Sequence, residues 1–99
     1  MQDPLDEMVK TLAKVRDEKL IKDFLVCLLT QSELEEIGKR WALVRLLDEG
    51  HSQRKIAEEL HLSLCKITRG SRELKKPNSA FRAFIDLYKR IEATLPPDK

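Results

Sequence analysis

The sequence predicts an all-α fold made of six helices in a single domain, residues 1–99. Apolar residues recur at helical spacing along most of the chain, and glycine, which weakens helices, occurs only 3 times. Capping patterns mark where several helices begin, and one segment has the pattern of two short helices that meet at a corner. A single chain of this size buries a modest fraction of its surface, so a partner chain would help to stabilise it.

The composition, with 41% hydrophobic and 36% charged residues, is typical of a folded, soluble protein. No apolar run approaches the roughly 18 residues of a membrane span, and the first ten residues are too polar for a secretory signal. Cys27 and Cys65 match no redox or zinc spacing and are expected to be reduced, which favours a cytoplasmic location without membrane contact.

Two short helices are expected in the first third of the chain. Asp3 can cap the first helix, which has Pro4 in its first turn and continues to about Arg16. The second helix carries apolar residues on one side: Leu20, Ile21, Phe24, Leu25 and Leu28. The run from Leu25 to Leu29 is more apolar than two helices need, so part of it is expected to pack against another chain. A dense core within one chain is the alternative.

The third helix is expected to be the longest. Thr30 and Glu33 form a capping box, in which each side chain can bond to the other residue's backbone N–H. Apolar residues then follow along the helix until Gly50, which is expected to end it. Trp41 on this helix is expected to serve packing rather than ligand binding.

The segment from Ser52 to Lys76 has the pattern of a helix-turn-helix. Its apolar residues fit two short helices, with the small side chain of Ala57 where the helices approach closely. The corner falls at His61 and Leu62, a place where the backbone often takes a positive φ. Ser63 can then cap the second helix. An ordinary helical hairpin with a basic, solvated face is the alternative.

The second helix of this motif is strongly basic. From Ser63 to Lys76 it has five basic residues and one acidic residue, whereas residues 1–36 hold nine acidic and five basic ones. Such localised positive charge suits the phosphate backbone of double-stranded DNA. The start of a reading helix reaches the base edges, while the helix before it crosses the backbone. The predicted DNA-binding residues are Gln53, Arg54, Leu64, Cys65, Lys66, Thr68 and Arg72.

A last helix is expected after Pro77, which cannot continue the basic helix. Asn78 or Ser79 can cap this last helix, and its apolar side is rich in aromatic residues. The helix should fold back onto the third helix or onto the first helices of a partner. The residues from Pro96 to Lys99 are expected to form a loose tail.

The sequence predicts neither a catalytic site nor a metal-binding site. His51 and His61 have no cysteine or carboxylate arrangement that would complete a tetrahedral metal site. The chain has no glycine-rich phosphate loop, and Cys65 has no obvious paired base. The sequence therefore predicts a protein that is not an enzyme.

One set of motifs carries a family resemblance. It consists of Ile67-Thr68-Arg69-Gly70-Ser71 with Leu74-Lys75, the preceding Ser52-Gln53-Arg54, and Leu28-Leu29-Thr30 with Arg40 upstream. In these motifs the chain resembles the tryptophan operon repressor (Trp repressor) family, over roughly Cys27 to Tyr88. The resemblance implies an interlocked homodimer, in which helices one, two, three and six of both chains form the core and helices four and five form the reading heads.

The resemblance also implies L-tryptophan as corepressor ligand, with no other cofactor. Arg40 and Arg69 can hold the indole ring between two guanidinium planes, because arginine stacks on aromatic faces. The resemblance implies further that Arg69 meets the carboxylate and that Gly70 leaves room beside the ring. The other subunit would supply Thr30 and the carbonyls of Cys27 and Leu29.

Two positions depart from the family pattern. Glu73 stands where a serine is expected near the ligand; it can pair with Arg69, four residues earlier, or accept the ammonium group of the ligand. Lys66 stands where a small hydroxyl residue is usual. It can donate to a guanine or to a phosphate, so the operator sequence is open.

The predicted function is a sequence-specific transcriptional repressor of tryptophan biosynthesis or transport genes, activated by L-tryptophan. Two alternatives stay open. The first is a DNA-binding regulator of the same fold that does not sense tryptophan. The second is a helical interaction module whose basic face binds an acidic protein.

Overall fold

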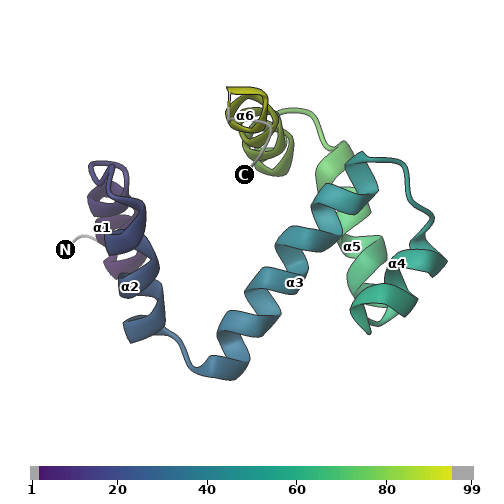
Figure 1. The fold of residues 1–99 in the computed structure, drawn as a ribbon, viewed down its shortest axis with the longest axis horizontal. Helices are drawn as coiled ribbons and strands as arrows, with labels where there is room; N and C mark the ends of the chain where they lie inside the picture. Colours follow the sequence, from purple (N-terminus) through teal and green to yellow (C-terminus); the bar gives the residue numbers. More distant parts are fainter. Residues whose placement is uncertain (1–2, 95–99) are drawn as a thin grey trace. The chain divides into compact units, whose positions relative to one another are not determined.

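The computed structural model describes residues 3–94, which form six α-helices and no β-strand (Figure 1). The helices are α1 (Pro4–Leu12), α2 (Glu18–Leu28), α3 (Gln31–Asp48), α4 (Gln53–Leu60), α5 (Leu64–Lys75) and α6 (Ala80–Thr94). The predicted six-helix, all-α class is thus confirmed. The predicted tail from Pro96 to Lys99 lies outside the described residues. Within residues 3–94, no helix is long and apolar enough to cross a membrane.

The chain divides into two compact units, Met1–Glu36 and Ile37–Lys99. In the first unit, Asp3 caps α1 as predicted, and its carboxylate accepts a hydrogen bond of 2.9 Å from the Leu5 N–H. The prediction that α1 continues to about Arg16 is wrong, because the helix ends at Leu12. Asp17 has an extended backbone so that its side chain can cap α2, and the residues before it must leave the helix to allow this.

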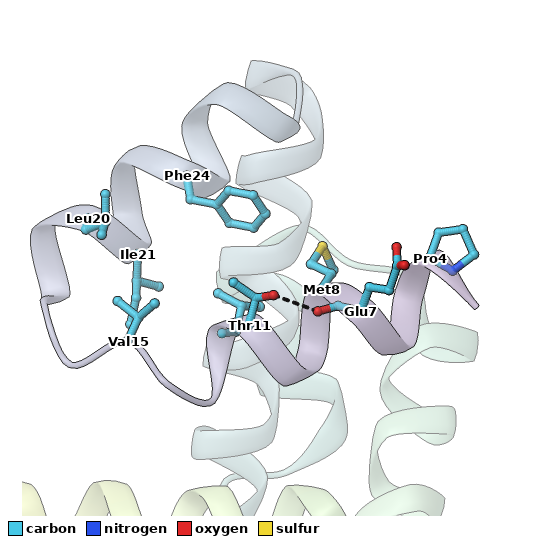
Figure 2. A pocket seen from close by; sticks show the side chains of 9 residues that line it. Pro4, Glu7, Met8, Thr11, Val15, Leu20, Ile21 and Phe24 are labelled. Atoms are coloured by element: carbon cyan, nitrogen blue, oxygen red, sulfur yellow. Dashed lines mark hydrogen bonds between the residues drawn. The ribbon is translucent and has the colours of Figure 1, made fainter. Parts of the chain in front are cut away.

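An apolar groove of about 480 Å³ lies between α1 and α2. It is lined by Pro4, Glu7, Met8, Thr11, Leu12, Val15, Leu20, Ile21 and Phe24. Figure 2 shows Met8 of α1 and Phe24 of α2 pointing into it. None of the residues in these two helices is fully buried, so the first unit has no closed core of its own.

Local signals set both ends of α3. The predicted capping box is confirmed: the Glu33 N–H donates to Thr30 Oγ1 at 3.1 Å, and the Thr30 N–H donates to Glu33 Oε1 at 2.8 Å. Gly50 ends the helix with a φ of 93°, a conformation that is cheapest for glycine. The His51 N–H then bonds back to the Leu46 carbonyl at 3.1 Å, which satisfies one of the last carbonyls of the helix.

The core of the second unit joins α4 and α5 to the C-terminal half of α3 (Figure 1). Its buried members are Leu43 of α3, Ile56 of α4, Leu62 in the corner and Ile67 of α5. Partly buried residues pack around them: Leu46, Leu47, Ala57 and Leu60. The long helix therefore serves as the support on which the helix-turn-helix is built.

The last helix, α6, packs against α3 of the same chain. Of the two predicted caps, Ser79 is the one used, because its Oγ accepts the Arg82 N–H at 3.2 Å while Asn78 takes a positive φ of 58°. Tyr88 of α6 meets Trp41 of α3 edge to face, with 5.9 Å between ring centroids. Trp41 thus contributes to packing.

An ion-pair network also ties α6 to the end of α3. The Asp48 carboxylate, whose side chain is only 8% exposed, lies 2.8 Å from Arg82 Nη2 and 2.6 Å from Lys89 Nζ. The hydrogen bond from Lys89, followed by that from Arg82, lowers the pKa of Asp48 from its ordinary value of 3.8. The C-terminal end of a helix carries a partial negative charge, which disfavours a carboxylate there, and the two cations offset this effect.

Because its pKa is lowered by folding, Asp48 stabilises the protein above about pH 4, and this contribution is lost as the pH falls through its folded-state pKa. We expect Asp48→Asn to cost about 1–3 kcal/mol of unfolding free energy at pH 6 and less at pH 3, because protonation removes part of the charge that the two cations stabilise. Urea unfolding at both pH values measures this difference.

Asp86→Asn is the matched control. Asp86 contacts the same Arg82 at 3.1 Å, but its side chain is 51% exposed. This substitution should cost less than about 1 kcal/mol at either pH. Equal losses for the two variants would show that burial of the Asp48 carboxylate is irrelevant.

Candidate DNA-reading face and ligand pocket

The helix-turn-helix has the predicted corner. His61 ends α4 in the left-handed region, with φ 55° and ψ 46°, and the Leu62 N–H bonds back to the Ala57 carbonyl at 3.2 Å. Histidine tolerates this region better than a β-branched residue would. Ser63 then caps α5 by accepting the Lys66 N–H at 3.3 Å, as predicted. Leu62 turns inward at the corner and is buried with Ile56 and Ile67, which fixes α5 against α4.

The predicted DNA-binding residues all lie on exposed parts of these two helices. Thr68 Oγ1 donates to Gln53 Oε1 at 3.3 Å, so residues 15 apart in sequence meet between the start of α4 and the second turn of α5. Leu64, at the first position of α5, is 56% exposed. An exposed leucine at this position has no role in the core, but it can contact the methyl group of a thymine.

A second pocket, also of about 480 Å³, lies in the second unit and is lined by residues of α3, α5 and the start of α6. Helix α3 contributes Arg40, Leu43 and Val44, helix α5 contributes Lys66, Arg69, Gly70 and Glu73, and the start of α6 contributes Ser79, Ala80 and Phe81. Its size is within the usual range for small-molecule sites. The structure thus brings together four of the predicted ligand-binding residues: Arg40, Arg69, Gly70 and Glu73.

Gly70 lets α5 approach α3 closely. A Cβ atom at this position would come within 3.1 Å of Leu43 Cδ2 and 3.5 Å of Leu43 Cγ. A larger side chain would therefore push Leu43, which is at once a pocket residue and a core residue. Glycine at this position permits close packing of helix on helix, and the pocket opens beside that contact.

Pairing with Arg69, one of the two possibilities left open for Glu73, is not observed among the described residues. Glu73 pairs instead with Lys76, whose Nζ donates to Glu73 Oε2 at 2.7 Å. The hydrogen bond from Lys76 is the main cause of the lowered pKa of Glu73, and Arg69 adds only a weaker charge effect. Lys76 prevails because it caps α5 with an extended backbone, from which its long side chain can turn back.

The remaining predicted ligand residues lie in the first unit: Cys27 in the last turn of α2, and Leu29 and Thr30 in the connection between α2 and α3. The Thr30 side chain takes part in the capping box of α3. Both cysteines are free and exposed. The assignment of these three residues to a site completed by another subunit stays a prediction.

Sequence reasoning missed several residues that line the pocket. Leu43 and Val44 follow Arg40 by three and four positions, so helical spacing alone could have placed them on the same face of α3. Lys66 precedes Arg69 by three positions, so the same reasoning could have placed it on the pocket face of α5. No local signal indicates Ser79, Ala80 and Phe81, because they reach the pocket only through the packing of α6. Among residues 3–94, no group of three or more His, Cys, Asp or Glu side chains could hold a metal ion.

Comparison with known proteins identifies relatives. The family model described as Trp repressor protein matches residues 3–89. A Trp operon repressor homolog of Chlamydia trachomatis serovar D is 36% identical over 74 residues, which are 74% of this chain and 79% of the relative. A Trp operon repressor homolog of Xylella fastidiosa strain M23 is 38% identical over 72 residues, 72% of this chain and 78% of the relative. A third, from Chlamydia caviae, is 32% identical over 80 residues, 80% of this chain and 79% of the relative. No solved structure matches the chain at a significant level.

Proposed function

This chain belongs to the Trp repressor family, and from that premise we propose that it is a homodimeric repressor whose affinity for operator DNA is raised by L-tryptophan. The family is one of DNA-binding regulators and not of enzymes, so the chain is a DNA-binding regulator. Its targets in this proposal are genes of tryptophan biosynthesis or transport.

The observation that carries the proposal is the double role of α5. The first turns of this helix hold the exposed residues Leu64, Cys65 and Thr68, while Arg69 and Gly70 of the same helix line the pocket. Any molecule in the pocket therefore lies against the helix that reads DNA. Lys66 belongs to both surfaces, since it is exposed in the first turn and also lines the pocket.

The chemistry of the pocket supports tryptophan as the ligand. Leu43, Val44 and Phe81 offer apolar surface for a ring, and Arg40 and Arg69 offer guanidinium groups from two different helices. Guanidinium planes stack on indole, and they also bind carboxylates through charge-assisted hydrogen bonds. An aromatic amino acid satisfies both features, whereas a purely apolar ligand would leave the cations unused.

Exposed apolar side chains support the homodimer. They occur on α1 and α2 in the first unit, where the groove of Figure 2 is open, and on α6 in the second unit. The large exposed apolar residues on these helices are Leu5, Val9, Leu20, Phe24, Val26 and Leu28 in the first unit and Phe84, Leu87 and Ile91 on α6. Apolar surface of this extent is a feature of subunit interfaces. A second copy covering it would join both units of each chain into one domain.

We expect sedimentation equilibrium to return the mass of two chains at micromolar concentration. Replacing Phe84, which is 63% exposed, with glutamate should shift the equilibrium towards single chains, because a charge would be buried in the interface. Arg90→Glu is the control, because it changes the charge at an exposed site of the same helix. Lys89→Glu is unsuitable, because Lys89 is ion-paired with Asp48. A wild-type mass of one chain would contradict the homodimer.

The decisive experiment measures the coupling between the two ligands. Calorimetry with L-tryptophan, in the presence and absence of operator duplex, should show that DNA tightens tryptophan binding by the same factor by which tryptophan tightens DNA binding. This factor is expected to be about 5–150, the usual range for coupled sites. A dimer spanning two successive major grooves must place its reading helices about 34 Å apart, and the ligand beside α5 would favour that separation.

The alternatives give different results. DNA binding that is unaffected by tryptophan would favour a regulator of the same fold that does not sense it. A helical module for an acidic protein would show no preference among duplexes, and it would lack the steep linear fall of log affinity with log salt that phosphate contacts produce.

A further inference from the structure

The pocket face of α3 continues to the end of the helix. Arg40, Val44 and Asp48 follow one another at intervals of four positions, so their side chains lie on one side of α3. Arg40 and Val44 line the pocket, whereas Asp48 stands one turn beyond it. Both oxygens of the Asp48 carboxylate contact α6, because Oδ1 lies 2.8 Å from Arg82 Nη2 and Oδ2 lies 2.6 Å from Lys89 Nζ.

Arg82 links this carboxylate to the wall of the pocket that α6 supplies. The Arg82 guanidinium donates to Asp48, and the Arg82 backbone N–H donates to Ser79 Oγ at 3.2 Å. Residues 79–81 form the wall, and Arg82 follows them directly in the chain. A fixed position of the Arg82 side chain therefore fixes the first turn of α6 beside the pocket.

Apolar packing holds this first turn less firmly than the rest of α6. Of the described residues of α6, only Ile85 is fully buried, and it lies one turn after the wall. Phe81 is half-buried and Ala80 is exposed. The ion pair between Asp48 and Arg82 thus holds the part of α6 where burial contributes least.

We propose that Asp48 is a positioning residue for the pocket: by holding Arg82 it fixes the wall of residues 79–81 against α3, and it thereby raises ligand affinity without contacting the ligand. The inference rests on the proposed tryptophan pocket and adds a determinant of affinity that lies outside the pocket. A wall that is already in place need not be ordered when the ligand binds, which is the general benefit of preorganisation. By reciprocity, a bound ligand favours the arrangement in which Asp48 holds Arg82.

The test compares the two cations of this one carboxylate, with L-tryptophan binding to the full-length protein measured by calorimetry in the absence of DNA. Arg82→Met should weaken binding about three- to thirtyfold, the scale of residues that act on a site without touching its ligand. Lys89→Met is the matched control, because it removes an equal charge from the same carboxylate about two turns further along α6. It should change the affinity by less than about twofold. Thermal unfolding should show similar losses of stability for both variants.

Three further variants identify the route of the effect. Arg82→Lys keeps a cation that can pair with Asp48, so it should bring the affinity back to within about threefold of wild type. Asp48→Asn should weaken tryptophan binding as Arg82→Met does, and Arg82→Met should then have no additional effect in the Asp48→Asn background. Asp86→Asn removes the exposed partner of Arg82 and should leave the affinity unchanged. Should Asp48→Asn fail to fold, the variants of Arg82 and Lys89 still decide.

The outcomes separate this inference from the proposed function. If wild-type protein does not bind L-tryptophan, the tryptophan assignment and the inference are both overturned. If it binds tryptophan but Arg82→Met and Lys89→Met weaken binding equally, the Asp48 network only stabilises the fold, and the inference alone is overturned. Failure of Arg82→Lys to restore affinity would also overturn it, because the guanidinium would then act in some way other than its pairing with Asp48.

Discussion

Replacing Ile67 with alanine should lower the free energy of unfolding by about 2–5 kcal/mol, the usual cost of emptying a buried isoleucine site. Ile67 is 0% exposed and packs with Leu43, Ile56 and Leu62, which come from α3, α4 and the corner between the reading helices. These neighbours belong to separate elements that are fixed by their own caps, so they cannot easily collapse into the space left behind. Urea unfolding monitored by circular dichroism measures the loss.

Leu64→Ala is the matched control, because it changes a large apolar residue three positions earlier on the same helix. Leu64 is 56% exposed, so its replacement should change stability by less than about 0.5 kcal/mol. The two variants should also differ in DNA binding. Leu64→Ala is expected to weaken binding while the protein remains folded, since Leu64 lies on the predicted reading face. A stability loss for Leu64→Ala as large as that for Ile67→Ala would contradict the core described for the second unit.

Arg69→Ala should weaken L-tryptophan binding by about 10–100-fold, the range expected when a charge-assisted hydrogen bond to a carboxylate is removed. Arg69 is exposed and lines the pocket beside Gly70, so its loss should leave the core unchanged. Tryptophan should then no longer raise operator affinity at concentrations that saturate the wild-type protein. Calorimetry and operator titrations at fixed salt measure the two effects.

Two further variants sharpen this result. Arg69→Lys keeps the charge but loses the planar, forked group, so an intermediate affinity is expected if stacking contributes. Arg72→Ala removes the same residue type one turn later on α5, at an exposed position outside the pocket, and should leave tryptophan binding in the absence of DNA unchanged. Equal weakening by Arg69→Ala and Arg72→Ala would mean that only the general positive charge of α5 attracts the ligand.

Much of the fold could be predicted because its signals are short-range. The caps at Asp3, Ser63 and the Thr30–Glu33 box each depend on hydrogen bonds between residues no more than three positions apart. The corner at His61 likewise follows from the lengths of the two short helices. Where two local signals compete, prediction was less successful. The apolar spacing of the first helix extends past Leu12, but the cap at Asp17 begins a new helix and ends the first one early.

Local sequence patterns were enough to predict the order of the six helices and the helix-turn-helix, and they include the motif residues Arg40, Arg69 and Gly70 that carry the family resemblance. Three features could not be predicted from local patterns: α6 returns to α3 through Asp48, Ser79 to Phe81 form a wall of the pocket, and Glu73 pairs with Lys76 rather than with Arg69. The two groups of features differ in how far apart the interacting residues are in sequence and in how many partners each residue can take. A cap has one partner within a turn, whereas a pocket wall depends on packing between distant segments, and an exposed carboxylate among several cations takes the one whose side chain reaches it at least cost.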